Sequence, residues 1–239
     1  MLENYCEKLI SILNDIKNSQ SEKIRKAANM VAKVIENDGI IYIFGCGHSH
    51  FIGLDCFYRA GGLANVCAML EEDLMLHISA SNSSKLEKTK DIAEGVFKKY
   101  NITKNDILFV ISTSGKNAVP CEMALTAKKY GIPTVSVVSG AYFNDKSDTK
   151  KLYECTDMFI DNCVPHGDAV MDITGSAVKM GSVSTAAGSF IMQSVLLEAA
   201  EIVAEKGIQA PIYMSGNIEG GAEYNRQLIE KYKPRVKHL

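Results

Sequence analysis

The stretch that decides the fold covers residues 106–139 and reads DILFVISTSGKNAVPCEMALTAKKYGIPTVSVVS. It contains an apolar run at 107–111, a loop with three hydroxyl residues and a glycine, a helical pattern over 118–130 and a second apolar run at 133–138. Short apolar runs rich in β-branched residues are typical of strands that are buried on both faces of a parallel sheet. The stretch therefore predicts a strand–helix–strand unit of an α/β domain.

The same alternation continues on both sides of this unit. Further strands are predicted at residues 40–44, 66–70 and 158–160. Helical patterns separate the strands, at roughly 49–60, 84–100 and 146–154, and a long apolar helix over 183–206 follows them. This order predicts a doubly wound parallel sheet in a three-layer α/β domain, with helices on both faces.

The two ends of the chain carry helical patterns of their own. Apolar residues recur at three- and four-residue steps over 2–16 and again over 24–35, with a polar stretch between them, so we expect an N-terminal helical hairpin. The tail contains glycine turns and then a short helix from Ala222. We predict a single domain, with N-terminal helices at 1–38, a core at 39–209 and a C-terminal tail at 210–239.

Composition narrows the functional class. The chain has 239 residues, 46% of them hydrophobic, and a formal charge of −2, so it is globular in composition and offers no general attraction for nucleic acid. Its seven cysteines are odd in number and never form a C-x-x-C pair, which favours reduced thiols over disulfides or zinc. Neither a signal peptide nor an apolar run of about 20 residues is apparent, so we expect a cytoplasmic protein without a membrane or nucleic-acid partner.

The first loop that could bind a ligand follows the strand at 40–44 and reads Gly-Cys-Gly-His-Ser-His over 45–50. Its glycines permit a tight turn and a close approach of the backbone to a ligand, and Ser49 lies where a helix begins. The loop resembles G-x-G-x-x-G but has His50 in place of the third glycine. By itself it does not decide which ligand is bound.

The second loop, Ser112-Thr113-Ser114-Gly115-Lys116-Asn117, follows the strand at 107–111 and leads into a helix. One serine would be enough to cap that helix, whereas three hydroxyl residues in a row supply the neutral donors that a phosphate monoester needs at a helix N-terminus. A nucleotide-binding P-loop requires a Ser or Thr after the lysine, and this chain has Asn117 there. The second loop therefore predicts a phosphate site that does not hold a nucleoside triphosphate.

At these loops the chain resembles the sugar isomerase (SIS) domain family. The matching stretches are IYIFGCGHSHFIGLDCFYRAGG over 41–62 and residues 106–139, and FYRAGGL, VPHGDAV and SGNIEGGAEYNRQL are similar to a bacterial subgroup of phosphosugar isomerase-like proteins. The resemblance implies a flavodoxin-like sheet of five strands and a homodimer or homotetramer. It also implies a set of phosphate ligands, which comprises Ser49, Ser112, Thr113, Ser114 and Asn117. From their places in the first loop we add Gly47 and His48 to the predicted phosphosugar-binding residues.

Isomerisation of an aldose to a ketose proceeds through an enediol. It needs a carboxylate or an imidazole as the base that moves a proton between the two adjacent carbons. The resemblance points to the last long helix, where Glu201 and Glu198 are the catalytic candidates, although either side chain would also suit a solvated helix face. His166, in Pro165-His166-Gly167-Asp168 after the fifth strand, is the third candidate, and ordinary turn residues are the alternative explanation.

No metal and no cofactor are expected. The phosphoheptose isomerase branch of the family carries a His and a Glu on the helix after the first loop, and the matching positions here are Asp55 and Arg59. The sequence therefore predicts a protein that binds a phosphorylated sugar or amino sugar and isomerises it. The alternatives are a sugar-phosphate sensor without catalysis, and a lyase (etherase) or deaminating isomerase that uses the same phosphate site.

Overall fold

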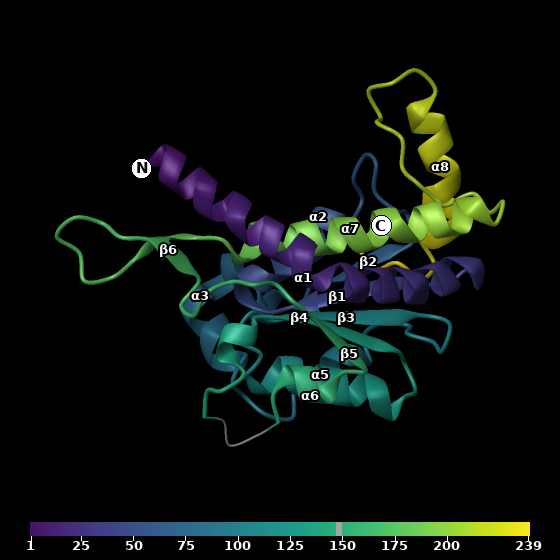
Figure 1. Cartoon of the computed structure of the whole chain (residues 1–239). Helices are drawn as coiled ribbons and strands as arrows, with labels where there is room; N and C mark the ends of the chain where they lie inside the picture. The colour runs from purple at the N-terminus through teal and green to yellow at the C-terminus, as the bar shows by residue number, and fades with distance from the viewer. Residues whose placement is uncertain (147–149) are drawn as a thin grey trace.

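The computed structural model describes residues 1–146 and 150–239 and has a five-stranded parallel sheet at its centre (Figure 1). The strands are β1 (Ile41–Gly45), β2 (Val66–Met69), β3 (Ile107–Ile111), β4 (Thr134–Val138) and β5 (Met158–Asp161). Their order in the sheet is β2-β1-β3-β4-β5. The predicted α/β class, the flavodoxin-like order and the positions of all five strands are confirmed.

Successive residues of each strand face two separate cores. Ile41 and Ile43 of β1 point into a core formed with α1 (Leu2–Glu36), α2 (His50–Cys56) and α7 (Ser184–Glu205). Tyr42 and Phe44 point into a second core, which contains residues of α4 (Ala93–Phe97), α5 (Ala118–Lys129) and α6 (Leu152–Cys155). Because both faces are covered, the strands read as continuous apolar runs and not as alternating ones.

The N-terminal segment is one helix, α1, and the predicted hairpin is wrong (Figure 1). The hydroxyls of Ser19 and Ser21 donate to backbone carbonyls one turn earlier, so both are satisfied within the helix. Gln20 is buried, and its side-chain oxygen accepts from the amide of Asp161 at 3.1 Å. The polar break therefore marks a contact with the end of β5 and not a turn.

Three other segments differ from expectation. The helix predicted at 84–100 is replaced by α3 (Leu76–Leu86) and α4, and Asp91, which adopts a left-handed φ of 65°, lies between them. The helix predicted at 146–154 is observed only as α6, and residues 147–149 lie outside the described part. A hairpin of β6 (Ala169–Met171) and β7 (Met180–Ser182) was not predicted, because strands of three residues are too short to give a periodic pattern. The tail helix is observed as α8 (Gly221–Tyr232).

Helix α7 lies beside α1 on one face of the sheet (Figure 1). Within the described residues it is the one helix long and apolar enough to cross a membrane by length and composition. Its residues Ile191, Val195 and Ala199 are fully buried among α1, α2 and the sheet. Packing in the core therefore accounts for much of its apolar character.

Candidate functional site

The two predicted ligand loops begin side by side. Strands β1 and β3 are parallel neighbours, and their last residues, Gly45 and Ile111, are partners in the register. The chain continues from β1 to β2 on one side and from β3 to β4 on the other, so a crevice opens between the two strand ends. This position, at the carboxyl end of the sheet, is where open α/β sheets bind their ligands.

The first loop forms a tight turn that brings Ser49 close to the end of β1. Gly47 has a left-handed φ of 54° and starts the 3₁₀ helix η1 (Gly47–Ser49), and the amide of Ser49 donates to the carbonyl of Cys46 at 3.0 Å. Ser49 is half-buried, and its hydroxyl has no hydrogen-bond partner in residues 1–146 and 150–239. His48 is exposed at the surface of the turn. The hydroxyl of Ser49 is thus free to bind a ligand at this edge.

His50 supports the turn from inside. Its side chain is buried, and its Nδ1 contacts the carbonyl oxygen of Gly47. Because a carbonyl only accepts, Nδ1 carries the hydrogen in this contact. Burial lowers the pKa of His50, which favours the neutral ring. His50 therefore acts as part of the scaffold of the first loop.

Two of the three hydroxyls in the second loop organise the turn itself. The Oγ of Ser112, a buried residue, accepts from the amide of Gly115 at 3.3 Å, and the Oγ1 of Thr113 accepts from Asn162 at 3.4 Å. A hydroxyl that accepts in this way keeps its own hydrogen and can donate it to an anion. Gly115 has a left-handed φ of 59°, which explains the glycine in the motif.

The remaining donors of the second loop are available. Ser114 and Asn117 are half-buried, and the side chain of Asn117 makes no cap bond to helix α5 although it occupies the N-cap position. The amides of Ser114, Lys116 and Asn117 find no acceptor within the described chain. A turn with free amides at a helix N-terminus is suited to a phosphate group.

His166 is brought to the second loop through a carboxylate that the sequence did not single out. Asp145 pairs with Lys116 at 2.6 Å and contacts Nε2 of His166 at 3.1 Å. The loops also join through their backbones, since the amide of Ser139 donates to the carbonyl of Thr113 at 2.9 Å. Lys116 follows Gly115 directly and was visible in the motif, whereas Asp145 lies in no motif and became evident only from the fold.

Asp168, which the sequence places beside His166, has a structural role. Its Oδ1 accepts from the amides of Val183 and Ser184, and its Oδ2 accepts from the hydroxyl of Ser184 at 2.6 Å. These bonds satisfy the free amides at the start of α7. Asp168 therefore anchors the last helix to the ligand edge of the sheet.

The structure does not bring Glu198 and Glu201 to the two loops of the same protomer. Both side chains are exposed on α7, and the helix starts at the ligand edge and runs away from it. At about 1.5 Å per residue they lie roughly 20–25 Å along the axis from Ser184. A catalytic role for either carboxylate requires that another subunit supply the loop edge.

Asp55 and Arg59, the positions matched above to a His and a Glu of the phosphoheptose isomerase branch, belong to a polar cluster. Arg59 donates to the carboxylate of Asp55, and Gln193 of α7 donates to its other oxygen at 3.0 Å. Over the described residues, no group of three or more His, Cys, Asp or Glu side chains is placed to hold a metal ion. This cluster ties α2 to α7.

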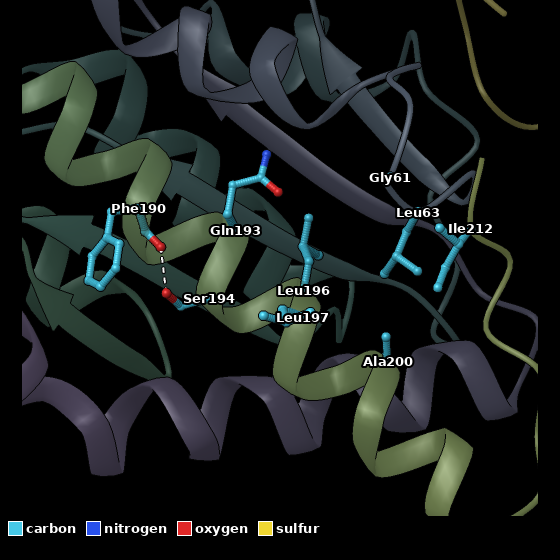
Figure 2. Close-up of a pocket in the computed structure, with 10 residues that line it drawn as sticks. Gly61, Leu63, Phe190, Gln193, Ser194, Leu196, Leu197, Ala200 and Ile212 are labelled. Atoms are coloured by element: carbon cyan, nitrogen blue, oxygen red, sulfur yellow. Dashed lines mark hydrogen bonds between the residues drawn. The ribbon is translucent and has the colours of Figure 1, made fainter. Parts of the chain in front are cut away.

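A groove of about 330 Å³ lies next to this cluster, between the turn after α2, helix α7 and the tail (Figure 2). Its lining is mainly apolar and includes Leu63, Leu196 and Ile212. None of the phosphosugar-binding residues predicted from the sequence lines it. Leu197 at its edge is 74% exposed, so this face of α7 presents apolar surface to the surroundings.

Comparison with known proteins assigns the chain to a family. The profile of the SIS domain matches residues 4–139. The chain is 41% identical to the UPF0309 protein GK1441 of Geobacillus kaustophilus over 240 residues, which cover 99% of this chain and 96% of that protein. It is 39% identical to the UPF0309 protein TTE0306 of Caldanaerobacter subterraneus subsp. tengcongensis over 246 residues, which cover all of both chains.

Solved structures with the same fold are more distant in sequence. A phosphoheptose isomerase from Francisella tularensis superposes with a TM-score of 0.57 at 16% identity, over 84% of this chain and 96% of that one. A phosphoheptose isomerase from Neisseria gonorrhoeae has a TM-score of 0.51 at 17% identity, over 87% and 97%. These likenesses concern the fold alone. From its profile match and its full-length relatives, the chain belongs to the SIS domain family.

Proposed function

We propose that this protein binds a phosphorylated sugar or amino sugar between the loops after β1 and β3 and catalyses its aldose–ketose isomerisation. The observation that carries the proposal is the second loop, where free amides and the hydroxyls of Ser112, Thr113 and Ser114 meet at the start of α5. A phosphate dianion gains from these donors and from the positive end of the helix dipole. Ser49 reaches the same crevice from the neighbouring strand end.

The neutral character of these donors favours a phosphate monoester on a small molecule. Asn117 and the backbone amides offer hydrogen bonds without charge, and Lys116 is engaged by Asp145. The first loop lacks the third glycine of a dinucleotide fingerprint, which disfavours a pyrophosphate there. A sugar ring anchored by its phosphate would extend from the loop toward His48 and His166.

Proton transfer is assigned to His166 in the first instance. Its ring belongs to the cluster that includes Lys116, and an imidazole is the side chain used most often for general acid–base catalysis. Glu201 and Glu198 stay candidates for a site shared between subunits. The mainly apolar groove beside α7, with the exposed Leu197 at its edge, supports the proposal of a homodimer or homotetramer, and we propose a cytoplasmic location.

Phosphosugar binding is tested by thermal unfolding with a panel of ribose 5-phosphate, glucose 6-phosphate and glucosamine 6-phosphate. The free sugars and inorganic phosphate are the controls. A ligand at about 100 times its Kd stabilises the fold by about 2.7 kcal/mol, which for a chain of this size raises Tm by roughly 5–10 °C. Stabilisation by free sugars, with none by any phosphosugar, would refute the binding proposal.

The phosphate loop is tested by the double variant Ser112→Ala/Ser114→Ala. Loss of hydrogen bonds to a charged ligand, each worth about 1.5–3 kcal/mol, weakens binding by at least tenfold. The matched control is Ser84→Ala, because Ser84 is an exposed serine on α3 that donates only to the carbonyl of Ala80. An unchanged Kd in the double variant would place the phosphate elsewhere.

Catalysis is separated from binding alone by NMR in D₂O. An isomerase exchanges the proton at the second carbon of the bound sugar with solvent, whereas a sensor binds the sugar without exchange. A lyase or deaminating isomerase would release an acid or ammonia, which the same spectra and an ammonia assay detect. Saturation by a phosphosugar with none of these changes would establish the sensor function.

A further inference from the structure

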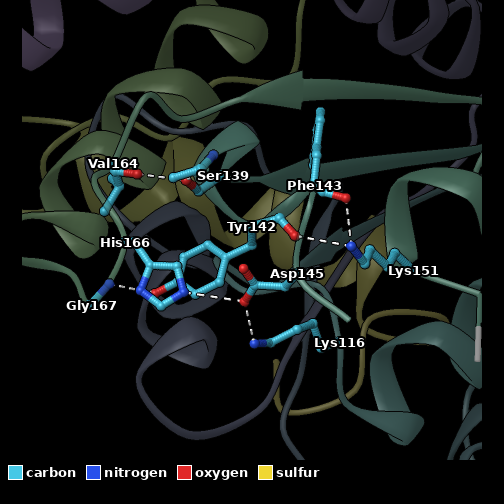
Figure 3. Close-up of polar contacts among 10 residues, drawn as sticks. Lys116, Ser139, Tyr142, Phe143, Asp145, Lys151, Val164, His166 and Gly167 are labelled. Carbon is cyan, nitrogen blue, oxygen red and sulfur yellow. Dashed lines mark hydrogen bonds and ion pairs between the residues drawn. The ribbon is translucent and has the colours of Figure 1, made fainter. Parts of the chain in front are cut away.

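The loops after β4 and β5 are built around a single exposed imidazole (Figure 3). The 3₁₀ helix η3 (Gly140–Tyr142) follows β4, and Ser139 just before it donates to the carbonyl of Val164 at 2.5 Å. The hydroxyl of Tyr142 accepts from the amide of Gly167 at 2.8 Å. These bonds hold the two loops together on both sides of His166.

The backbone at Tyr142 is held in place by a buried lysine. Lys151 is buried, and its ammonium donates to the carbonyls of Tyr142 at 3.1 Å and of Phe143 at 2.5 Å. The phenol ring stacks on the imidazole of His166, with 4.3 Å between the ring centroids and 27° between the planes. The buried lysine therefore stabilises a rigid aromatic platform for a side chain that is itself 61% exposed.

The Asp145 contact decides which nitrogen of His166 is free. An ionised carboxylate only accepts hydrogen bonds, so Nε2 of His166 must donate to Oδ2 of Asp145 across the 3.1 Å between them. The neutral ring then carries its hydrogen on Nε2, and Nδ1 is left as an unprotonated acceptor. Within the described chain, Nδ1 has no hydrogen-bond partner.

Lys116 keeps this carboxylate ionised and connects it to the second loop. Hydrogen bonds from Lys116, and then from His166, lower the pKa of Asp145. The ammonium of Lys116 also lies 5.2 Å from the centre of the Tyr142 ring. Because Lys116 follows Gly115 directly, its ion pair with Asp145 links the second loop to the imidazole.

We infer that Asp145 and Tyr142 are positioning residues that present Nδ1 of His166 as the base for the sugar bound at the second loop. This inference rests on the proposed function and adds the residues that make His166 able to perform it. Nδ1 takes the proton from the second carbon, and the C–H electron pair becomes the double bond of the enediol. The π pair of the first carbonyl moves onto the first oxygen, which takes a proton from water. The solvent-exposed imidazolium exchanges its proton with water in part of the turnovers and returns a proton to the first carbon. The second oxygen then loses its proton to water and becomes the new carbonyl oxygen.

The first experiment reads the ring without any ligand. In long-range ¹H–¹⁵N spectra of the unliganded protein at alkaline pH, the signals of His166 are assigned by their disappearance in His166→Asn. We expect a protonated Nε2 and an unprotonated Nδ1 in the wild type, and a mixture of both tautomers in Asp145→Asn. A wild-type ring that carries its hydrogen on Nδ1 would overturn the inference whatever the activity of the protein.

The second experiment follows solvent exchange at the second carbon of the best phosphosugar from the panel. General-base catalysis contributes about 10²–10⁴-fold, so His166→Ala should lose at least a hundredfold in rate, and Asp145→Asn at least tenfold, with Kd unchanged within about threefold. Added imidazole should restore exchange in His166→Ala, since the site of the missing ring is open to solvent, but not in Asp145→Asn. The matched control is Asp172→Asn, because Asp172 is an exposed carboxylate of the β6–β7 hairpin that pairs with Lys179.

Failure of this inference and failure of the proposed function give different results. If the phosphosugar binds and exchanges at the wild-type rate in both His166→Ala and Asp145→Asn, the inference is wrong and the proposed function stands. If the wild type binds no phosphosugar, or binds without exchange, both fall.

Discussion

Gly45→Ala tests whether the first loop belongs to the ligand site. A methyl group on Gly45 would lie 2.6 Å from the carbonyl carbon and oxygen of Ser49 and 2.8 Å from its Cβ. Non-bonded carbon atoms normally approach to about 3.5–4.0 Å, so Ser49 must move by about 1 Å. Most of the clash is with backbone, and the loop cannot relieve it by turning one side chain.

The displacement should affect stability and binding together. Overpacking of this kind costs about 1–3 kcal/mol, which lowers Tm by roughly 2–10 °C in a chain of this length. A hydroxyl shifted by about 1 Å loses its bond to a charged phosphate, worth about 1.5–3 kcal/mol, and so weakens Kd by about ten- to a hundredfold. Urea and thermal unfolding measure the first effect, and titration with the best phosphosugar of the panel measures the second.

The matched control is Gly95→Ala. Gly95 is exposed inside helix α4, and a methyl group there would meet no atom within 4 Å. Alanine is the better helix former by about 1 kcal/mol, so this variant should unfold at a slightly higher temperature and bind with wild-type affinity. If Gly45→Ala unfolds at a lower temperature or urea concentration but binds the phosphosugar as tightly as the wild type, the first loop is outside the ligand site. If neither quantity changes, the packing argument is wrong.

Three further predictions concern the scaffold. Asp106 is buried, and its carboxylate accepts from an arginine of the tail and from two backbone amides. Asp106→Ala should therefore lower the free energy of unfolding, measured in urea, by about 3–5 kcal/mol. The control Asp172→Ala, at an exposed carboxylate, should change it little. Burial raises the pKa of Cys56 to about 12, so iodoacetamide at pH 8 should modify the exposed Cys6 first, as followed by mass spectrometry. Asp168→Ala should lower the free energy of unfolding by about 1–2 kcal/mol through loss of the α7 cap.

Each of these has a contrary result. If Asp106→Ala lowers the free energy of unfolding by less than about 1 kcal/mol, water or another group must bond the two backbone amides that donate to Asp106 in the wild type. Modification of Cys56 as fast as Cys6 in the folded protein would show that α2 opens readily. For Asp168, a thermal unfolding curve that matches the wild type would remove its assigned role at the start of α7.

The strands were predictable because helices cover both faces of the parallel sheet. Strands buried in this way consist mainly of apolar residues. The runs at 40–44 and 107–111 carry no polar residue, and the structure has β1 and β3 within one residue of those bounds. The helix after β3 was predictable for a similar local reason, since the second loop supplies the start of α5. Segments that lacked such local signals were placed less well.

Two of the errors share a cause, which is contact with distant residues. The stretch around Gln20 reads as a break by composition but stays helical because its amide group meets the end of β5. The hairpin of β6 and β7 has weak strands and forms beside the start of α1, where Tyr5 donates to the carbonyl of Ser182 at 2.8 Å. No window of sequence contains both partners of either contact.

The sequence by itself determined the α/β class, the five strands and the two loops rich in glycine and hydroxyl groups, because each depends on residues close together in the chain. Only the tertiary structure decided which candidate side chain lies near the second loop. Both His166 and Glu201 are candidates from the sequence, but Asp145 and Tyr142 hold His166 near Lys116, whereas the direction of α7 carries Glu201 away from that edge. The physical reason is that a proton moves only over hydrogen-bond distances, and those distances are set by how the loops pack and not by their order in the chain.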